Sequence, residues 1–396
     1  MKKILFAAMI AILIVGCQKT EVINQQRGPS LSFSTGMSKL TKSQGTVSAV
    51  NPGIRNLEAQ DFSVWAYAGE GDFSSVTNLD SQTKIYDGIE NLLVECKNPS
   101  VIAVEDDLNT DTNEKVDGVP GTWSTKKEYY WPGDQKSLRF FAVSADQSWL
   151  HTTPCPVAIT YNVPSLTISN FEVKATAVKN DEGEVIKKAA NEDLMVADFV
   201  EQDQTKKNVD LTFRHTLSKV QFDFKTLTPD DGKPAPDVWV QSVSVAGMQY
   251  KGNLNVTVDP EVTERTAWKF EWDQDEATET FTDDYNEQAT YLEGSEAAVL
   301  ADNTAMKLTT KYETFTTWLM LPQDIDENSK VTITYVINKR QFTSIFPLNG
   351  DKNTKITAWT DNQHIKYNVI LAPNVISFKP IVQDWTNSST DIPHEN

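Results

Sequence analysis

Along most of the chain, apolar and polar residues alternate with a period of two, in short runs between turns rich in Gly, Pro, Asn and Asp. Successive side chains of a β-strand point to opposite faces, so this alternation predicts half-buried strands. The apolar positions of the clearest runs are Phe62, Val64, Ala66 and Ala68; Val209, Leu211 and Phe213; Val220, Phe222 and Phe224; Val243 and Val245; Leu254, Val256 and Val258; Val331, Ile333, Tyr335 and Ile337; and Tyr367, Val369 and Leu371. In the first run, Trp65 and Tyr67 point the other way. No long amphipathic pattern competes, so the chain predicts an all-β fold of the sandwich type.

The first 16 residues differ from this pattern. Two lysines at positions 2 and 3 precede an apolar run over residues 4–15, which ends at Gly16 and Cys17. A membrane-spanning helix needs about 20 apolar residues, so the shorter run is typical of a secretory signal peptide. Its end, Ile14, Val15, Gly16 and Cys17, resembles the lipobox of bacterial lipoproteins. The resemblance implies signal-peptidase cleavage between Gly16 and Cys17 and lipid on Cys17, which would anchor the protein to the outer membrane. The alternative is an ordinary signal peptide with an incidental cysteine.

The length of 396 residues predicts two domains of ordinary size. A polar gap over residues 201–207 separates Val200 from the apolar run that begins at Val209. We therefore expect a signal peptide over residues 1–16, a lipidated linker over 17–29, an N-terminal sandwich over 30–203 and a C-terminal sandwich over 204–396.

Charge narrows the range of partners. The chain has 36 basic and 55 acidic side chains, a net charge of −19. Such a surface repels phosphate backbones, which argues against nucleic-acid binding and against electrostatic binding to anionic lipid.

Apart from Cys17, the cysteines are Cys96 and Cys155. They could pair in an oxidising envelope if their Cα atoms lie within about 7 Å, or they could remain buried thiols.

Candidate chemistry is sparse. The four histidines, at positions 151, 215, 364 and 394, are scattered and match no nucleophile, zinc or phosphate motif, so we expect no catalytic residue, metal or cofactor. The loop carrying Asp107, Asn109, Asp111 and Asn113 copies the alternating oxygen ligands of a calcium loop. However, Thr112 replaces the required glycine, and Gly118 stands where a bidentate glutamate belongs. A solvated acidic loop is the preferred interpretation.

Several strings occur in an order that resembles one known family. They are residues 61–68; Gly121, Thr122 and Trp123; Tyr129, Tyr130, Trp131 and Pro132; residues 138–142; Asp193, Leu194, Met195 and Ala197; Phe213, His215, Leu217, Ser218 and Lys219; and Ile376, Ser377 and Phe378 with Asp384 and Trp385. In this order they resemble the fimbrillin family of Bacteroidetes. The resemblance implies two tandem transthyretin-like β-sandwiches and a surface lipoprotein that acts, without enzymatic activity, as a pilus subunit or related adhesin of the fimbrium.

The resemblance also implies assembly by strand exchange with other pilus subunits. In this mechanism a trypsin-like protease cuts after an arginine and releases the first strand, and a strand of another subunit fills the exposed groove. Residues 30–34 suit the displaced strand, because Leu31 and Phe33 share one face. Arg55 is the single arginine of the loop over residues 36–60 and is the candidate processing site, although it could also be an ordinary solvated residue. Cleavage after Arg27 would leave the strand in place.

The last apolar stretch offers two roles that the sequence leaves open. Ile376, Phe378, Ile381 and Trp385 could belong to a donor strand for a neighbouring subunit, or to the closing strand of the second sandwich. Pro380 interrupts the stretch, and proline in a sheet belongs at edges or bulges. The second role would suit a tip, anchor or non-polymerising subunit.

A different class of function competes with this interpretation. Trp123, Tyr129, Tyr130, Trp131 and Trp149 could offer flat platforms to sugar rings, which would make the chain an outer-membrane glycan-binding lipoprotein. Aromatic residues in strands more often pack in a core or across a sheet. The sequence does not define the adhesion ligand, whether on host or bacterial surfaces, or the position of the subunit in a fibre.

Overall fold

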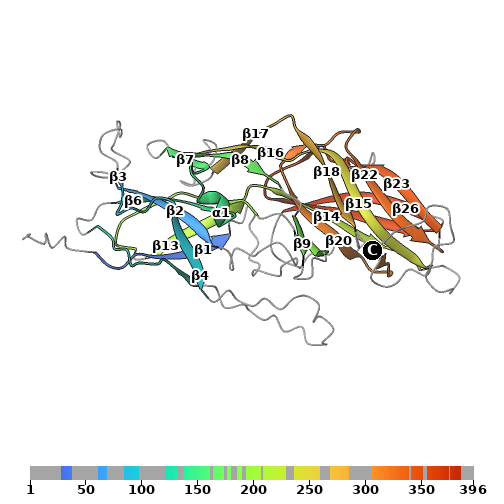
Figure 1. Ribbon diagram of the computed structural model, residues 1–396, viewed down its shortest axis with the longest axis horizontal. Coiled ribbons are helices and arrows are strands. Elements are labelled where there is room, and N and C mark those ends of the chain that lie inside the picture. Colours follow the sequence, from blue (N-terminus) through green and yellow to red (C-terminus); the bar gives the residue numbers. More distant parts are fainter. Residues whose placement is uncertain are drawn as a thin grey trace, which may run out of the picture.

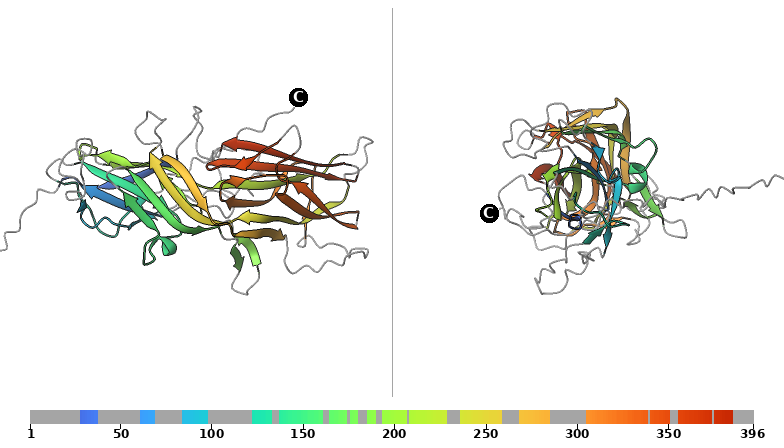
Figure 2. Two further views of the ribbon diagram at one scale, coloured as in Figure 1. Left: turned by 90° about the horizontal axis from the view of Figure 1, so that it is seen from above. Right: turned by 90° about the vertical axis from the view of Figure 1, so that its left-hand side faces the viewer.

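The computed structural model describes residues 28–37, 61–68, 84–97, 122–132, 137–160, 164–173, 176–179, 185–189, 193–206, 208–228, 236–258, 268–284, 305–338, 340–350, 355–373 and 375–384. Within these ranges the chain is almost entirely β, with one short helix, α1 (Gln147–Leu150). Two sandwiches follow one another along the long axis of the molecule (Figures 1 and 2). The predicted all-β class with tandem sandwiches is confirmed.

The first sandwich is built from a nine-stranded sheet and a four-stranded sheet. The larger sheet has the order β1 (Ser32–Met37), β13 (Asn208–His215), β11 (Met195–Ala197), β6 (Leu138–Ser144), β2 (Phe62–Ala68), β4 (Leu92–Lys97) and β5 (Thr122–Ser124), with β12 (Val200–Gln202) beside β6 and β3 (Lys84–Ile85) beside β2. The smaller sheet has the order β17 (Trp268–Gln274), β16 (Lys251–Val258), β8 (Ser165–Glu172) and β7 (Val157–Thr160).

The second sandwich is more regular. One sheet has the order β20 (Glu313–Met320), β14 (Ser218–Lys225), β25 (Gln363–Ala372) and β26 (Val375–Asp384). The other has the order β18 (Thr278–Asp284), β15 (Val238–Gln249), β22 (Lys330–Ile337) and β23 (Arg340–Pro347), with β19 (Met306–Lys307) beside β15. Two small ribbons, β9 (Thr176–Lys179) with β10 (Val185–Ala189) and β21 (Gln323–Asp324) with β24 (Ala358–Trp359), complete the described strands.

The inner strands β2 and β6 of the nine-stranded sheet are buried on both faces. Trp65 and Phe141 point to one face and belong to a large hydrophobic cluster that continues into the second sandwich. Phe62 and Phe140 point to the other face, where they belong to a separate cluster that we call the first-strand core. The first-strand core comprises Leu31, Phe33, Phe62, Val64, Ala66, Ile89, Val94, Tyr129, Trp131, Leu138, Phe140, Ala142, Met195, Ala197, Val209, Leu211 and Phe213. Strands β2 and β6 are therefore more apolar than a half-buried strand requires.

The sheets do not divide the chain at the expected boundary between residues 203 and 204. Residues 203–206 form a turn that follows β12 in the same sheet, where Asp203 Oδ1 accepts a hydrogen bond from the Thr205 backbone nitrogen (2.8 Å). After this turn, β13 returns to the first sandwich beside β1 and β11. Strands β16 and β17 also complete the first sandwich, through the pairing of β16 with β8. The expected boundary is wrong because a polar turn and a polar linker have the same composition.

Among the described strands, the chain passes from one sandwich to the other between β13 and β14, between β15 and β16, and between β17 and β18. Two tryptophans of β17 donate side-chain hydrogen bonds to backbone oxygens near these connections. Trp268 Nε1 donates to Ala197 O (2.6 Å), and Trp272 Nε1 donates to Thr216 O (2.9 Å). Because the large hydrophobic cluster is continuous through this region, the sandwiches are packed as neighbours.

Candidate functional site

Strand β1 is the first described strand and lies at an end of the nine-stranded sheet. It runs parallel to β13, in a register that pairs Ser32 with Asn208 and Met37 with Phe213. On its other side, the Leu31 backbone nitrogen donates to Tyr129 O (2.8 Å), and the Trp131 nitrogen donates to Pro29 O (3.0 Å). Sequence-distant segments therefore hold β1 on both sides.

The inner face of β1 fills the first-strand core. Phe33 and Leu31, the residue directly before β1, are each 8% exposed, and we count Leu31 with the strand. The Phe33 ring meets the rings of Phe62 and Phe140 edge to face, with 6.2 Å between centroids in each pair. Burying two such side chains contributes roughly 3–6 kcal/mol, so most of the interaction energy of β1 comes from this face.

The outer face of β1 carries a polar ladder with β13. Ser32 Oγ donates to Asn208 Oδ1 (2.9 Å), and Asn208 Nδ2 donates to Ser34 Oγ (2.6 Å) and to Asp210 Oδ1 (2.5 Å). Ser34 Oγ also donates to Asp210 Oδ1. Asp210 is exposed, so this ladder aligns β1 with β13 at the surface.

Other expected positions lie outside the described residues. These are Gly16 and Cys17 of the lipobox, Arg27 and Arg55 around the first strand, Trp385 at the end of the apolar stretch, and the acidic loop over residues 107–118. Signal cleavage, lipidation and processing therefore stay predictions.

The C-terminal stretch forms β26, which pairs with β25 at the edge of the second sandwich. In this structure it occupies the closing-strand position. Ile376 and Val382 lie opposite the fully buried Leu371 and Ile365, yet Ile376 is 44% exposed and Val382 is 42% exposed. These two side chains are thus incompletely covered, whereas Pro380 on the same face is buried.

Strand β23, at the edge of the facing sheet, also carries an apolar side chain that is incompletely covered. Phe342 of β23 lies opposite the buried Tyr335 and is 44% exposed. Close to it, Phe346 stacks on Phe378 with 5.2 Å between ring centroids. The edges formed by β23 and β26 are therefore partly open and apolar.

The aromatic residues of the glycan-binding alternative do not form a platform among the described residues. Tyr129 and Trp131 are 4% and 1% exposed and belong to the first-strand core. Trp123 and Trp149 are partly buried and pack against the two hydrophobic clusters. These four residues serve packing, while Tyr130 is half-buried and its hydroxyl contacts Glu128.

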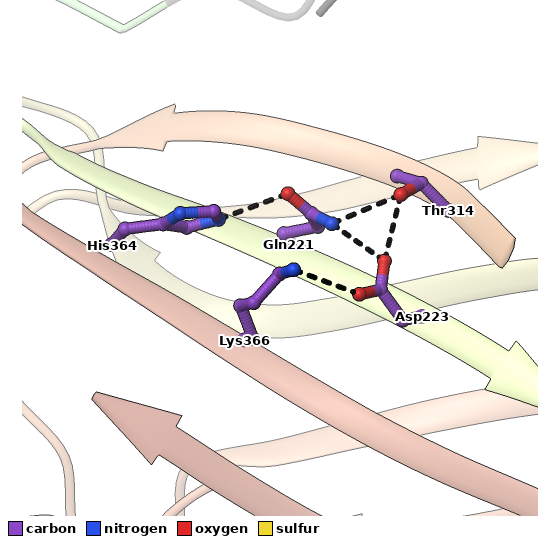
Figure 3. Close-up of polar contacts among 5 residues, drawn as sticks. All are labelled: Gln221, Asp223, Thr314, His364 and Lys366. Carbon is purple, nitrogen blue, oxygen red and sulfur yellow. Dashed lines mark hydrogen bonds and ion pairs between the residues drawn. The ribbon is translucent and has the colours of Figure 1, made fainter. Parts of the chain in front are cut away.

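A polar network lies on the outer face of the β20–β14–β25 sheet (Figure 3). Gln221 is central: its Nε2 donates to Asp223 Oδ1 (2.6 Å) and Thr314 Oγ1 (2.9 Å), and its Oε1 lies 2.9 Å from His364 Nε2. Lys366 Nζ lies 3.4 Å from Asp223 Oδ2. Burial, with the positive charges of Lys219 and Lys366, lowers the pKa of His364 to about 2. The imidazole is therefore a neutral structural group at physiological pH.

A second polar cluster lies where β13 leaves the first sandwich. Arg214 Nη2 lies 2.8 Å from Asp198 Oδ1, and His215 Nδ1 contacts Asp193 Oδ2. Burial raises the pKa of the Asp198 carboxyl, although Arg214 opposes the shift. Burial also raises the pKa of Asp361, again with Arg214 opposing it. The sequence showed His215 only as one of four scattered histidines, because ion pairs between distant segments leave no local signal.

The described histidines stand in separate settings, since His151 approaches Ser63 Oγ (3.3 Å) while His215 and His364 contact Asp193 and Gln221. Within the described ranges, no group of three His, Cys, Asp or Glu residues could hold a metal ion. The same ranges contain no helix that is long and apolar enough to span a membrane.

The two cysteines do not form a disulfide. Cys96 lies half-buried in β4, and Cys155 is exposed after α1. Neither arrangement that the sequence left open, a disulfide or two buried thiols, is therefore found. Burial, followed by the negative charge of Asp61, raises the pKa of the Cys96 thiol.

The comparisons with known proteins point to one family. Residues 55–385 match the family model described as fimbrillin-like. Among curated protein sequences, none matches the chain.

Two similar solved structures are both fimbrial proteins. A fimbrial protein from Bacteroides vulgatus is 14% identical, with 91% of this chain and 100% of that chain covered and a TM-score of 0.45. A fimbrial assembly protein from Parabacteroides distasonis is 10% identical, with 90% of this chain and 94% of that chain covered and a TM-score of 0.33.

Proposed function

The chain belongs to the fimbrillin-like family, and from this premise we propose that it is a subunit of a surface fimbrium or a related adhesin that acts without catalysis. Its partners are then other fimbrial subunits. We further propose that these subunits assemble by strand exchange, with β1 as the strand that is displaced.

The observation that carries the proposal is the position of β1. The strand inserts Leu31 and Phe33 into the first-strand core while lying at an end of its sheet. Its removal would expose the apolar side chains beneath it, including Phe62 and Phe140, together with the unpaired backbone groups of β13. An apolar groove flanked by an unpaired edge strand is the site that a strand from another chain completes.

The remaining parts of the proposal concern the termini. Lipid on Cys17, after cleavage that follows Gly16, holds the precursor on the outer membrane, and cleavage after Arg55 by a trypsin-like protease releases lipid and β1 together. The precursor would be protected from early polymerisation, since its own strand fills the groove. The donor is β26, whose core-facing side chains Ile376 and Val382 are only partly buried in the second sandwich.

An arginine-specific protease tests this proposal on the soluble protein that begins at Gln18. We expect a cut after Arg55, release of the segment that contains β1, and SDS-resistant oligomers, read by intact mass and gel. Arg55→Lys is the matched control, because it keeps the charge, resists the arginine-specific enzyme and remains sensitive to trypsin. A protein that is cut after residue 55, loses β1 and stays monomeric would exclude strand-exchange assembly.

A further inference from the structure

We propose that the outer face of β14, β25 and β26 binds a linear polysaccharide that carries a carboxylate on every second sugar. The contacts come from Lys219, Lys366 and Lys379, one on each strand, which we call the lysine row. The inference goes beyond the fimbrial role proposed above, because it gives the second sandwich a ligand of its own.

The orientation of the lysine row follows from the alternation of side chains along the three strands. The residues next to these lysines, Val220, Ile365 and Phe378, belong to the large hydrophobic cluster or pack against it. Successive side chains of a strand point to opposite faces, so the row points away from the core. The lysine of β26 is exposed, and those of β14 and β25 are half-buried.

The register places the three lysines on one diagonal. Along β25, Lys366 lies two residues beyond His364, the partner of Lys219. Lys379 pairs with Asn368, which lies two residues beyond Lys366. Each step therefore crosses one strand and advances two residues, which separates neighbouring Cα atoms by about 8 Å. This spacing is close to the length of a disaccharide, and flexible lysine stems can absorb the difference.

The polar network of Figure 3 holds the central lysine of the row. Lys366 Nζ lies 3.4 Å from Asp223 Oδ2, while Asp223 Oδ1 accepts hydrogen bonds from Gln221 Nε2 and Thr314 Oγ1. The distance of 3.4 Å exceeds that of a typical charge-assisted hydrogen bond, and an ammonium group has three donors. Lys366 is therefore positioned in advance and can still donate to a ligand carboxylate, which lowers the entropy lost on binding.

The charge of this face is opposite to that of the whole chain. The chain has a net charge of −19, whereas the described outward positions of the three strands carry four lysines, the row and Lys225, and one carboxylate, Asp223. The Lys225 ammonium lies over the ring of Tyr312, 4.3 Å from its centroid, so we place it outside the row. Charges elsewhere on the surface are screened beyond about 8 Å at physiological ionic strength. A short anionic ligand is therefore attracted to this face by the lysines close to it.

A polysaccharide fits this face better than an acidic peptide or a nucleic acid. The row crosses the strands on the face of the sheet, whereas a peptide strand is added at an edge. The described outward positions include no arginine, the side chain that binds phosphate in a bidentate manner. The neutral amides of Asn368 and Gln383 lie beside the row. Amide groups both donate and accept hydrogen bonds, as sugar hydroxyls require.

The complete row requires β26 to remain in the second sandwich, because Lys379 belongs to that strand. This consequence, unlike the binding itself, rests on the proposed strand exchange. The uncut protein has the complete row, and so does a fibre subunit whose β26 has not been donated. Binding is therefore tested on the uncut protein, where its failure is distinct from a failure of assembly.

Fluorescence anisotropy of a labelled hyaluronate decasaccharide tests the proposal on the uncut soluble protein that begins at Gln18. Hyaluronate carries a carboxylate on every second sugar. We expect saturable binding that weakens as NaCl is raised, and no binding of the carboxyl-reduced decasaccharide. A lack of hyaluronate binding, or equal binding of the carboxyl-reduced sugar, would overturn the proposal.

Substitutions locate the binding surface. Lys379→Gln should weaken binding by about threefold, and replacing all three lysines of the row with glutamine should weaken it by about tenfold, because each exposed ion pair is modest in strength. Lys379 is exposed on an edge strand, so the single variant should fold normally, and Lys379→Arg should retain binding. Lys330→Gln, at an exposed position of β22 in the facing sheet, is the matched control and should have no effect. Equal weakening by Lys330→Gln and Lys379→Gln would mean that only net charge matters and would overturn the lysine row.

A labelled decapeptide of glutamate distinguishes the class of ligand. It carries more carboxylates than the decasaccharide, so weaker binding of the peptide cannot result from a lower charge. We expect weaker binding of the peptide, and we expect Asn368→Ala to weaken hyaluronate binding by about twofold through the loss of a hydrogen bond. Peptide binding as tight as that of hyaluronate would overturn the polysaccharide and indicate an acidic peptide as the partner.

Discussion

Phe33 meets Phe62 edge to face, with 6.2 Å between ring centroids and an interplanar angle of 83°. The first ring belongs to a strand at the end of the sheet, and the second belongs to β2 within it. The ring pair therefore links β1, the strand that we propose is displaced, to β2, a strand inside the sheet. Outside this core, the described side-chain contacts of β1 are the polar ones with Asn208 and Asp210 at the surface.

Replacing Phe33 with alanine should destabilise the uncut protein by about 2–4 kcal/mol, measured by urea unfolding. The loss combines the transfer energy of the ring with the cavity left between Phe62 and Phe140. Ser32→Ala, on the outer face of the same strand, is the matched control and should cost less than about 1 kcal/mol. Equal effects of the two substitutions would contradict the assignment of the inner face as the source of the binding energy of β1.

Period-two alternation was sufficient to predict the fold class. The runs that contain Phe62, Val220 and Val331 form β2, β14 and β22. The first apolar pair, Leu31 and Phe33, is buried, but β1 begins at Ser32 and not at residue 30. Alternation predicts a face for each residue. It does not predict which second layer will cover that face, so the burial of Trp65 in a second core could not be foreseen.

Contacts between distant segments were the part that the sequence could not supply. Strand β16 follows a strand of the second sandwich but pairs with β8 in the first. Likewise, Gln221 and His364 meet only because β14 and β25 are parallel neighbours. Such pairings depend on topology, and local composition carries no information about them.

Acid should destabilise the protein partly through His364. Its folded-state pKa is about 2, whereas an unfolded histidine titrates near 6.5. Below about pH 6.5 the unfolded chain therefore binds a proton that the folded protein does not, and stability falls as the pH falls. Between pH 7 and pH 5, we expect His364→Gln to lose about 1–2 kcal/mol less stability than the unmodified protein. Parallel pH profiles of the two proteins would contradict the buried neutral imidazole.

Removing the positive charge of Arg214, where β13 leaves the first sandwich, should destabilise the protein. Arg214→Met leaves Asp198 and Asp361 without their neighbouring cation in a buried region, and we expect a loss of about 3–5 kcal/mol in thermal or urea unfolding. Adding Asp198→Asn to the variant should recover part of the loss, because it removes one of the two carboxylates. If Arg214→Met unfolds like the unmodified protein, the ion pair does not stabilise the junction.

The two thiols should react at different rates. Cys155 is exposed, while burial and the charge of Asp61 raise the pKa of Cys96. Because the thiolate is the reactive form, a maleimide at pH 7.5 should modify Cys155 well before Cys96 in the soluble protein that begins at Gln18. Peptide mass mapping over time measures the order. Asp61→Asn should accelerate the reaction of Cys96 without changing that of Cys155, and an unchanged rate would show that the carboxylate has no influence.

Ile376 distinguishes the stability of the precursor from its ability to donate a strand. In β26 its side chain is 44% exposed, whereas Leu31, beside the strand proposed to be displaced, is 8% exposed. Ile376→Glu should therefore change the unfolding free energy of the uncut protein by less than about 1 kcal/mol. After cleavage, the same variant should fail to donate its strand β26, because a buried unpaired carboxylate is strongly unfavourable.

The groove of the Ile376→Glu variant remains intact, so the variant should still accept the strand of an unmodified copy and thereby end growing polymers. Mixing cut variant with cut unmodified protein should shorten the oligomer ladder in proportion to the fraction added. Ser377→Ala is the matched control on the outer face and should polymerise. A variant that polymerises as well as the unmodified protein would exclude Ile376 from the donated face.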